Sequence, residues 1–133
     1  MANQSYVQID SEWDIVAARQ LGRELAKEIG FSTVDQARIT TAISELARNI
    51  YLYAGNGTIH LQRINSMGKV GLKIIAKDEG PGIPDIRKAM EDGFSTSGGL
   101  GAGLPGVKRL MDYFTVDTDV GKGTRIEVIK WLR

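Results

Sequence analysis

Two glycine-rich segments place the strongest constraint on how this chain can fold. The first, residues 78–84, has the sequence Asp-Glu-Gly-Pro-Gly-Ile-Pro and follows a short apolar run, so Asp78 is held where a strand ends in a sharp turn. The second, residues 98–103, has four glycines in six residues and precedes a helical pattern at 104–111. Exposed backbone N–H groups at the start of a helix favour an anion, and a fixed carboxylate accepts a hydrogen bond from an amine. The two segments therefore predict the walls of a pocket for phosphates and a purine.

The composition predicts one globular domain that spans residues 1–133, because 42% of the side chains are hydrophobic and can form a core. A net charge of +1, from 17 basic and 16 acidic residues, gives no bulk electrostatic reason to expect a nucleic-acid or membrane partner. The chain has no cysteine, which excludes disulfides and thiolate metal sites, and its first residues do not resemble a secretory signal. We therefore expect a cytoplasmic protein.

Two helices are predicted in the first half of the chain. Ser11, followed three residues later by a carboxylate, is a typical helix start, and Gly30 supplies the residue that ends this helix. Thr33 and Gln36 have the spacing of a second capping box, and the helix after them runs to about Tyr53. The apolar stripe of this second helix predicts that one face of it is buried.

Alternating patterns and turn residues predict the rest of the fold. The predicted strands are residues 6–9, 58–64, 70–77, 114–117 and 124–131. A short helix is expected at residues 84–90, and a loop at 94–99 has the composition of a mobile lid beside a site. Long helices combined with such strands indicate an α/β (α+β) two-layer sandwich, with the helices on one face of a mixed, mostly antiparallel sheet.

Glu45 and Asn49 lie four residues apart on the second helix, so their side chains are neighbours on one face. Polar pairs at this spacing decorate many solvated helix faces, and that alternative stays open. In the functional alternative the carboxylate is a general base, and the amide oxygen ligates Mg²⁺, a cation that takes oxygen ligands and keeps several waters.

Residues 101–106 match the pattern G-x-G-x-x-G, which suggests a dinucleotide-binding domain or the glycine-rich loop of a eukaryotic-type kinase. The surrounding sequence fits neither class. No predicted strand leads directly into these glycines, and only about 30 residues follow them, too few for the rest of either domain. A Walker A phosphate loop is excluded as well, because no Gly-Lys-Ser/Thr follows.

Four motifs occur together in a fixed order: Glu45 with Asn49 on a helix, residues 78–82 after a strand, residues 101–103 before a helix, and residues 121–124 before the last strand. In this combination the chain resembles the GHKL superfamily of ATPases and kinases, which has the Bergerat fold with an ATP lid. The resemblance implies that Glu45 is the catalytic base and that Asn49 ligates Mg²⁺. It also implies that Asp78 accepts a hydrogen bond from the adenine amino group.

By the same resemblance, further residues contribute to the nucleotide site. The glycines of the second segment present backbone groups to the phosphates, and Thr124 helps to hold the adenine. The complete set of nucleotide-binding residues implied by the resemblance is Asn49, Asp78, Gly80, Gly82, Ser97, Gly99, Gly101, Ala102, Gly103, Leu104 and Thr124.

Within the superfamily, residues 44–55 and 92–106 closely resemble the stand-alone bacterial serine/threonine kinases of partner-switching modules, in particular the switch kinases of stressosomes. This branch implies a protein kinase that depends on ATP and Mg²⁺ and phosphorylates STAS-domain scaffold proteins. When released, such a kinase binds and activates a PP2C-type phosphatase in general stress (sigma factor) signalling.

Two alternatives remain open at this point. The chain could be an anti-sigma factor kinase, although those kinases usually carry Thr before the Asn and a His-Ala-Tyr element after it, where this chain has Arg48 before Asn49 and residues 51–53 after it. The chain could also be a non-catalytic, nucleotide-dependent binding module, which the presence of Glu45 disfavours.

Overall fold

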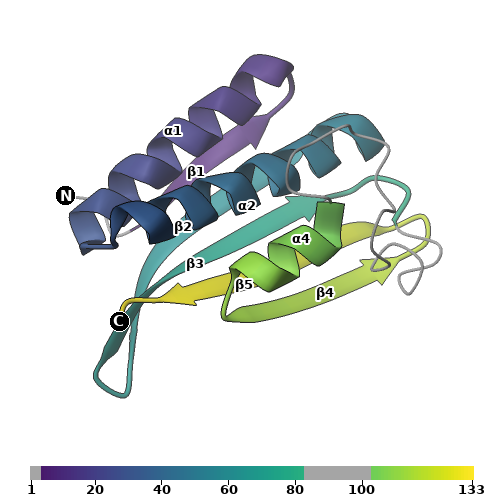
Figure 1. Ribbon diagram of the computed structural model, residues 1–133. Helices are drawn as coiled ribbons and strands as arrows, with labels where there is room; N and C mark the ends of the chain where they lie inside the picture. The colour runs from purple at the N-terminus through teal and green to yellow at the C-terminus, as the bar shows by residue number, and fades with distance from the viewer. Residues whose placement is uncertain (1–3, 83–102) are drawn as a thin grey trace.

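The computed structural model of the protein describes residues 4–82 and 103–133 (Figure 1). In this part of the chain, five strands form one sheet with the order β1-β2-β3-β5-β4. The strands are β1 (Gln4–Ile9), β2 (Gly57–Ser66), β3 (Lys69–Asp78), β4 (Tyr113–Asp119) and β5 (Gly123–Trp131). The helices are α1 (Glu12–Ile29), α2 (Thr33–Tyr53) and α4 (Gly103–Leu110).

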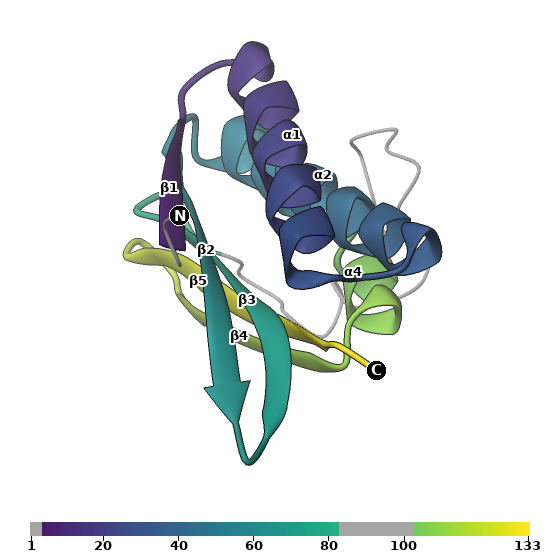
Figure 2. The same ribbon diagram turned by 90° about the vertical axis from the view of Figure 1, so that its left-hand side faces the viewer.

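The helices cover one face of the sheet, as Figure 2 shows from the side. This arrangement confirms the predicted two-layer α/β sandwich and, for the part of the chain that the structure describes, the predicted order of strands and helices. The sheet is more regular than the mixed sheet that we expected, because all four pairings between its described strands are antiparallel. β5 lies between β3 and β4, which brings the last strand of the chain beside the strand that ends at Asp78.

The two long helices begin at well-defined caps. At the start of α1, the backbone N–H of Ser11 donates to the Asp14 carboxylate at 3.0 Å, and Gly30 ends the helix with a φ of 111°. The predicted capping box of the second helix is wrong by one residue. Ser32 is the cap, and its hydroxyl oxygen accepts from the backbone N–H of Asp35 at 3.1 Å. Ser32 keeps an extended backbone, as a cap must, whereas Thr33 is already the first helical residue.

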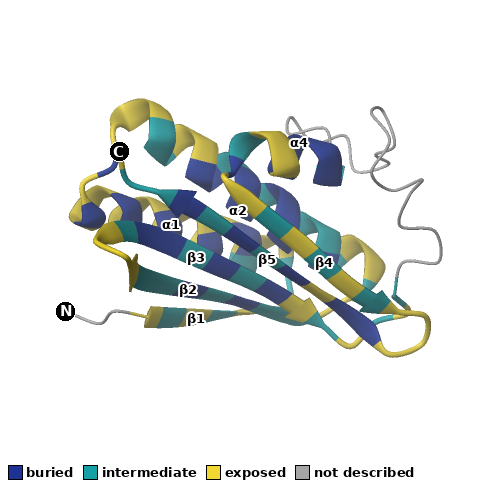
Figure 3. Cartoon of the chain, turned by 90° about the horizontal axis from the view of Figure 1, so that it is seen from below, coloured by how far each residue is buried: buried dark blue, intermediate teal, exposed yellow. Residues whose placement is uncertain are grey.

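The core lies between α2 and the inner face of the sheet, where the buried residues in Figure 3 line up along the helix and the central strands. The buried apolar residues of α2 are Ile39, Ala42, Ile43, Leu46, Ala47 and Ile50. The central strands contribute Ile59, Leu61, Leu72, Ile74, Ile126 and Val128. Each such Leu or Ile contributes roughly 1.5–3 kcal/mol through the apolar surface that it removes from water. The predicted apolar stripe of the second helix is therefore confirmed as the centre of the core.

Some predicted features lie outside the described residues. These are the short helix at residues 84–90 and the lid at 94–99. Among the helices that the structure describes, none combines the length and the apolar character needed to cross a membrane.

Candidate nucleotide and phosphotransfer site

Asp78 is the last residue of β3, and its side chain is held in place by backbone groups. One carboxylate oxygen, Oδ1, accepts from the backbone N–H of Gly80 at 2.9 Å. A further backbone hydrogen bond comes from Thr124, the residue that pairs with Asp78 across β3 and β5. The structure therefore places the carboxylate at a fixed position at the end of the sheet, as the turn chemistry of the sequence predicted.

The turn after Asp78 packs too closely against its neighbours to carry side chains at its glycines. A Cβ added to Gly80 would lie 2.5 Å from the Cβ of Ala54, the C-cap residue of α2. Gly82 has a φ of +80°, and a Cβ there would meet the backbone of Asp119 at the end of β4. The two glycines thus hold the turn between the end of α2 and the loop that joins β4 to β5.

Thr124 pairs with Asp78 across β3 and β5, and its role beside the adenine stays a prediction. Its side chain is buried, and its hydroxyl is 2.9 Å from the hydroxyl of Thr118 on β4. The hydroxyl of Thr118 also donates to the carbonyl oxygen of Gly123 at 3.2 Å. These contacts fix the orientation of the Thr124 side chain at the strand end.

Glu45 and Asn49 do not form the solvated pair that was one of the alternatives, because the Glu45 side chain is only 6% exposed. Asn49 is half-buried on the next turn of α2. Since α2 rises about 1.5 Å per residue, Asn49 lies about 7–8 Å along the axis from Ala54, where the turn of Gly80 makes contact. The end of α2 thus connects the helix that carries Glu45 and Asn49 to the turn that follows Asp78.

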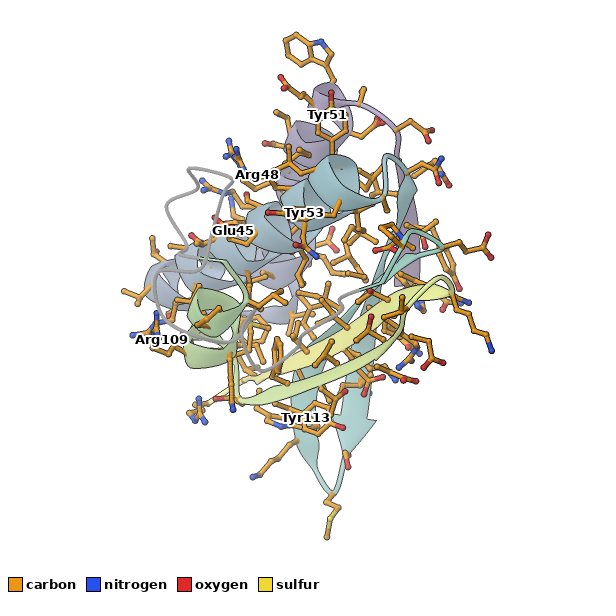
Figure 4. All side chains as sticks on the ribbon, turned by 90° about the vertical axis from the view of Figure 1, so that its right-hand side faces the viewer. Glu45, Arg48, Tyr51, Tyr53, Arg109 and Tyr113 are labelled. Carbon is orange, nitrogen blue, oxygen red and sulfur yellow. The ribbon has the colours of Figure 1, made fainter. Side chains whose placement is uncertain are left out.

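Glu45 lines a cavity of about 260 Å³ between α1 and α2. Arg19 and Arg23 of α1 and Arg48 of α2 also line this cavity. Figure 4 shows Glu45 and Arg48 close together along α2. We did not single out these arginines as a group from the sequence. The available signal was the four-residue spacing of Arg19 and Arg23 on one helix face, and it gave no indication of what α1 would pack against.

The second glycine-rich segment is only partly described. Gly103 begins α4 with a φ of +70°, a conformation that glycine adopts readily, and α4 packs beside α2. The Leu104 side chain is buried in the core, so only its backbone could face a nucleotide. The other predicted residues of this segment lie outside the described part of the chain: Ser97, Gly99, Gly101 and Ala102.

The described residues contain no group of three or more His, Cys, Asp or Glu side chains that could hold a metal ion by themselves. A Mg²⁺ ion that is bound mainly through nucleotide phosphates and water needs only one or two protein oxygens. The amide oxygen of Asn49, one turn from Glu45 on α2, fits that need. The donor set therefore suits a nucleotide-bound Mg²⁺ rather than a metal held by the protein alone.

The position of Asp78 has a consequence for stability that can be measured. Burial raises the pKa of Asp78 above its usual value of 3.8, and the backbone N–H groups of Gly80 and Thr124 offset part of this effect. The folded state therefore binds this proton more readily than the unfolded chain does. The contribution of Asp78 to the free energy of unfolding should then fall as the pH rises above 3.8.

Thermal unfolding of wild type and Asp78→Asn from pH 3.8 upward tests this expected loss of stability. The Tm of the variant minus that of the wild type should increase with pH and then level off, because only the wild type carries the titrating group. A difference that stays constant with pH would contradict the raised pKa.

Comparison with known proteins decides which family these residues belong to. The family described as histidine kinase-, DNA gyrase B-, and HSP90-like ATPase matches residues 34–133. The chain belongs to this ATPase family. The match includes α2, the turn after Asp78 and the whole second half of the sheet, and it confirms the GHKL resemblance.

Relatives within this family indicate which class of enzyme the chain belongs to. The chain is 74% identical to the serine/threonine-protein kinase RsbT of Bacillus subtilis (strain 168), over 133 residues and the full length of both chains. It is 31% identical over 121 residues to the anti-sigma F factor of Thermoanaerobacter sp. (strain X514), which covers 86% of this chain and 83% of that protein. The 74% identity to this kinase over the full length of both chains confirms the prediction of an ATP-binding serine/threonine-protein kinase.

Solved structures confirm the fold. A structure of the RsbU and RsbW domains of a Mycobacterium tuberculosis protein matches 99% of this chain with a TM-score of 0.66 at 17% identity. The matched part makes up 34% of that longer chain. The mycobacterial sensor histidine kinase MprB matches with a TM-score of 0.55 at 16% identity, over 96% of this chain and 97% of that one. The residue roles at the site stay predictions, since these similarities concern the fold.

Proposed function

We propose that this protein transfers the γ-phosphoryl group of Mg²⁺-bound ATP to a serine or threonine of a STAS-domain stressosome protein. The observation that carries the proposal is that the end of α2, the helix with Glu45 and Asn49, contacts the turn that fixes Asp78. In this proposal, the carboxylate for proton transfer and the carboxylate for base recognition lie on two elements that contact each other, α2 and β3. The full-length identity to a kinase named RsbT supports the protein substrate class.

In the proposed complex, Asp78 accepts a hydrogen bond from the adenine amino group, and Thr124 lies beside it at the strand end. Mg²⁺, where bound, would neutralise charge on the phosphates, and Asn49 is the residue suited to hold it. Gly103 presents its backbone at the start of α4 toward the phosphate side.

Glu45 performs the proton transfer in this proposal. The substrate hydroxyl gives its proton to the Glu45 carboxylate while its oxygen attacks the γ-phosphorus of ATP. The bond between the γ-phosphorus and the oxygen that bridges to the β-phosphorus breaks, and ADP leaves. A general base usually contributes about 10²–10⁴-fold to such a step.

We further propose that the protein acts in the cytoplasm as a partner-switching regulator of general stress (sigma factor) signalling. A chain of this size offers limited surface, so the STAS scaffold and a PP2C-type phosphatase should bind overlapping faces of it. Once released from the scaffold, the protein would bind the regulatory domain of the phosphatase and activate it. Phosphorylation adds about −1.5 to −2 charges to the scaffold, and repulsion by carboxylates near the site, such as Glu45, Asp78 and Glu79, would favour its release.

Phosphotransfer is tested directly by incubating the purified protein with labelled ATP, Mg²⁺ and a STAS-domain partner. Label should appear on serine or threonine of the partner, and removal of Mg²⁺ by EDTA should abolish it, because the phosphate charge would be left without a counter-ion. A partner in which each candidate acceptor is replaced by alanine is the matched control. Labelling that is insensitive to EDTA would contradict the magnesium role, and no labelling of any STAS partner would contradict the substrate class.

A second candidate function is an anti-sigma factor kinase, which the 31% identity to anti-sigma F factors supports. Affinity capture with purified sigma subunits in the presence of ATP distinguishes the two. Binding to a sigma subunit without phosphorylation of a STAS scaffold would favour this candidate. A third alternative, a non-catalytic binding module, would bind ATP in the same experiments and transfer no phosphate.

A further inference from the structure

The cavity beside Glu45 is lined by more positive than negative side chains. Three arginines line it, Arg19, Arg23 and Arg48, against the single carboxylate of Glu45, so its lining carries a net charge of +2. Within residues 4–82 and 103–133, none of the three arginines forms an ion pair. The Nε of Arg48 is buried and has no hydrogen-bond partner there. Buried polar groups in native proteins are nearly always satisfied, so the Nε of Arg48 is a donor available for an acceptor in this cavity.

The fold brings these arginines together through a close approach of two helices. Gly22 of α1 is buried, and a Cβ added there would meet the side chain of Ile43 on α2. Because glycine lets the helices approach at this point, Arg19 and Arg23 on either side of it reach across to the α2 face that carries Glu45. The hydroxyl-bearing residues Thr41 and Ser44 line the same cavity.

We infer that this cavity, which we call the arginine pocket, is the docking site for carboxylate side chains of the protein substrate. The inference rests on the proposed kinase function. Before transfer, the substrate carries carboxylates and no phosphoryl group, so an anion that positions the unmodified substrate must be an Asp or Glu side chain. Arginine binds carboxylates with two parallel hydrogen bonds, which fixes orientation as well as position.

The location of Glu45 explains what this docking achieves. Glu45 lines the arginine pocket, so an acidic side chain held by Arg23 or Arg48 brings the adjacent acceptor hydroxyl to the catalytic carboxylate. The residues proposed for adenine and metal binding, Asp78 and Asn49, do not line the pocket. The arginine pocket is therefore a substrate site that meets the nucleotide site at Glu45.

The experiment uses Arg23→Gln and Arg48→Gln, each of which removes one charge while keeping an amide donor. Lys69→Gln is the matched control, because Lys69 is exposed at the end of the β2–β3 hairpin, which projects away from the helices in Figure 1. Loss of one charge-assisted contact should raise the KM for the STAS substrate by roughly tenfold. The fall in kcat and in ATP affinity should be much smaller, and Lys69→Gln should behave as wild type.

Direct binding of the unmodified STAS partner, measured by calorimetry without ATP turnover, provides a readout besides activity. The affinity for the partner should be roughly tenfold lower in each arginine variant than in wild type. Added salt should also weaken binding less in the variants than in wild type, because one charged contact has been removed. In the Arg23→Gln variant, replacing an acidic residue next to the acceptor hydroxyl of the partner should not lower the affinity further. The reason is that Arg23 and that acidic residue form one contact, which the first substitution has already removed.

Two results would overturn the inference, and a third would overturn the proposed function instead. Arginine variants that bind and phosphorylate the partner as well as wild type would remove the docking role and leave the kinase function intact. An equal loss of ATP affinity in these variants would make the pocket part of the nucleotide site. If wild type phosphorylates no STAS partner, the proposed function fails, and the calorimetric comparison still shows whether the arginines bind an acidic protein.

Discussion

Glu45→Gln should lower the rate of phosphotransfer to a protein substrate by about 10²–10⁴-fold, the usual contribution of a general base. Glutamine has nearly the same shape as glutamate, so the substitution removes the proton acceptor without opening a cavity at a side chain that is only 6% exposed. ATP affinity should stay near the wild-type value, because Glu45 acts on the substrate hydroxyl and not on the nucleotide. Single-turnover phosphotransfer and calorimetric titration with ATP measure the two quantities separately.

The matched control is Glu24→Gln, which removes the same charge from an exposed position on α1. This variant should transfer phosphate at the wild-type rate. Thermal unfolding of both variants excludes a general loss of structure. If Glu45→Gln loses rate and ATP affinity to the same extent, Glu45 has a structural role, and its assignment as the base is wrong.

Asp78→Asn should weaken ATP binding by roughly ten- to a hundredfold. A hydrogen bond between a donor and a charged acceptor is worth about 1.5–3 kcal/mol, which corresponds to that range of dissociation constants. The backbone N–H of Gly80 can still donate to the asparagine side chain, so the turn should keep its conformation. Discrimination between ATP and GTP should fall together with affinity, because Asp78 is the group proposed to recognise the adenine amine.

Asp117→Asn serves as the control for this substitution, since Asp117 is an exposed carboxylate on β4. It should bind ATP as wild type does. Calorimetric titration with ATP and with GTP measures the dissociation constants of both nucleotides for wild type and both variants. Unchanged ATP affinity in Asp78→Asn would mean that another group recognises the adenine.

Much of the fold could be predicted from the sequence because it depends on local patterns. The apolar stripe of α2 fixes which helix face is buried, and the end of β3 at Asp78 follows from the glycines behind it. The position of the α2 cap was missed because Ser32 and Thr33 are both capable of capping, and only the backbone conformation distinguishes them. A parallel strand pair was allowed by the expected mixed sheet, whereas the described pairings are all antiparallel.

The sequence by itself determined the family, the order of strands and helices, and the proposal of Asp78 and Glu45 as the two functional carboxylates, since these depend on residue types at fixed spacings. Only the tertiary structure decided that Glu45 is buried and that it shares a cavity with Arg19, Arg23 and Arg48. The physical reason is that a helix pattern specifies which residues share a face and does not specify what covers that face. The other side of this cavity is formed by α1, whose approach to α2 at Gly22 is a contact between residues far apart in the chain.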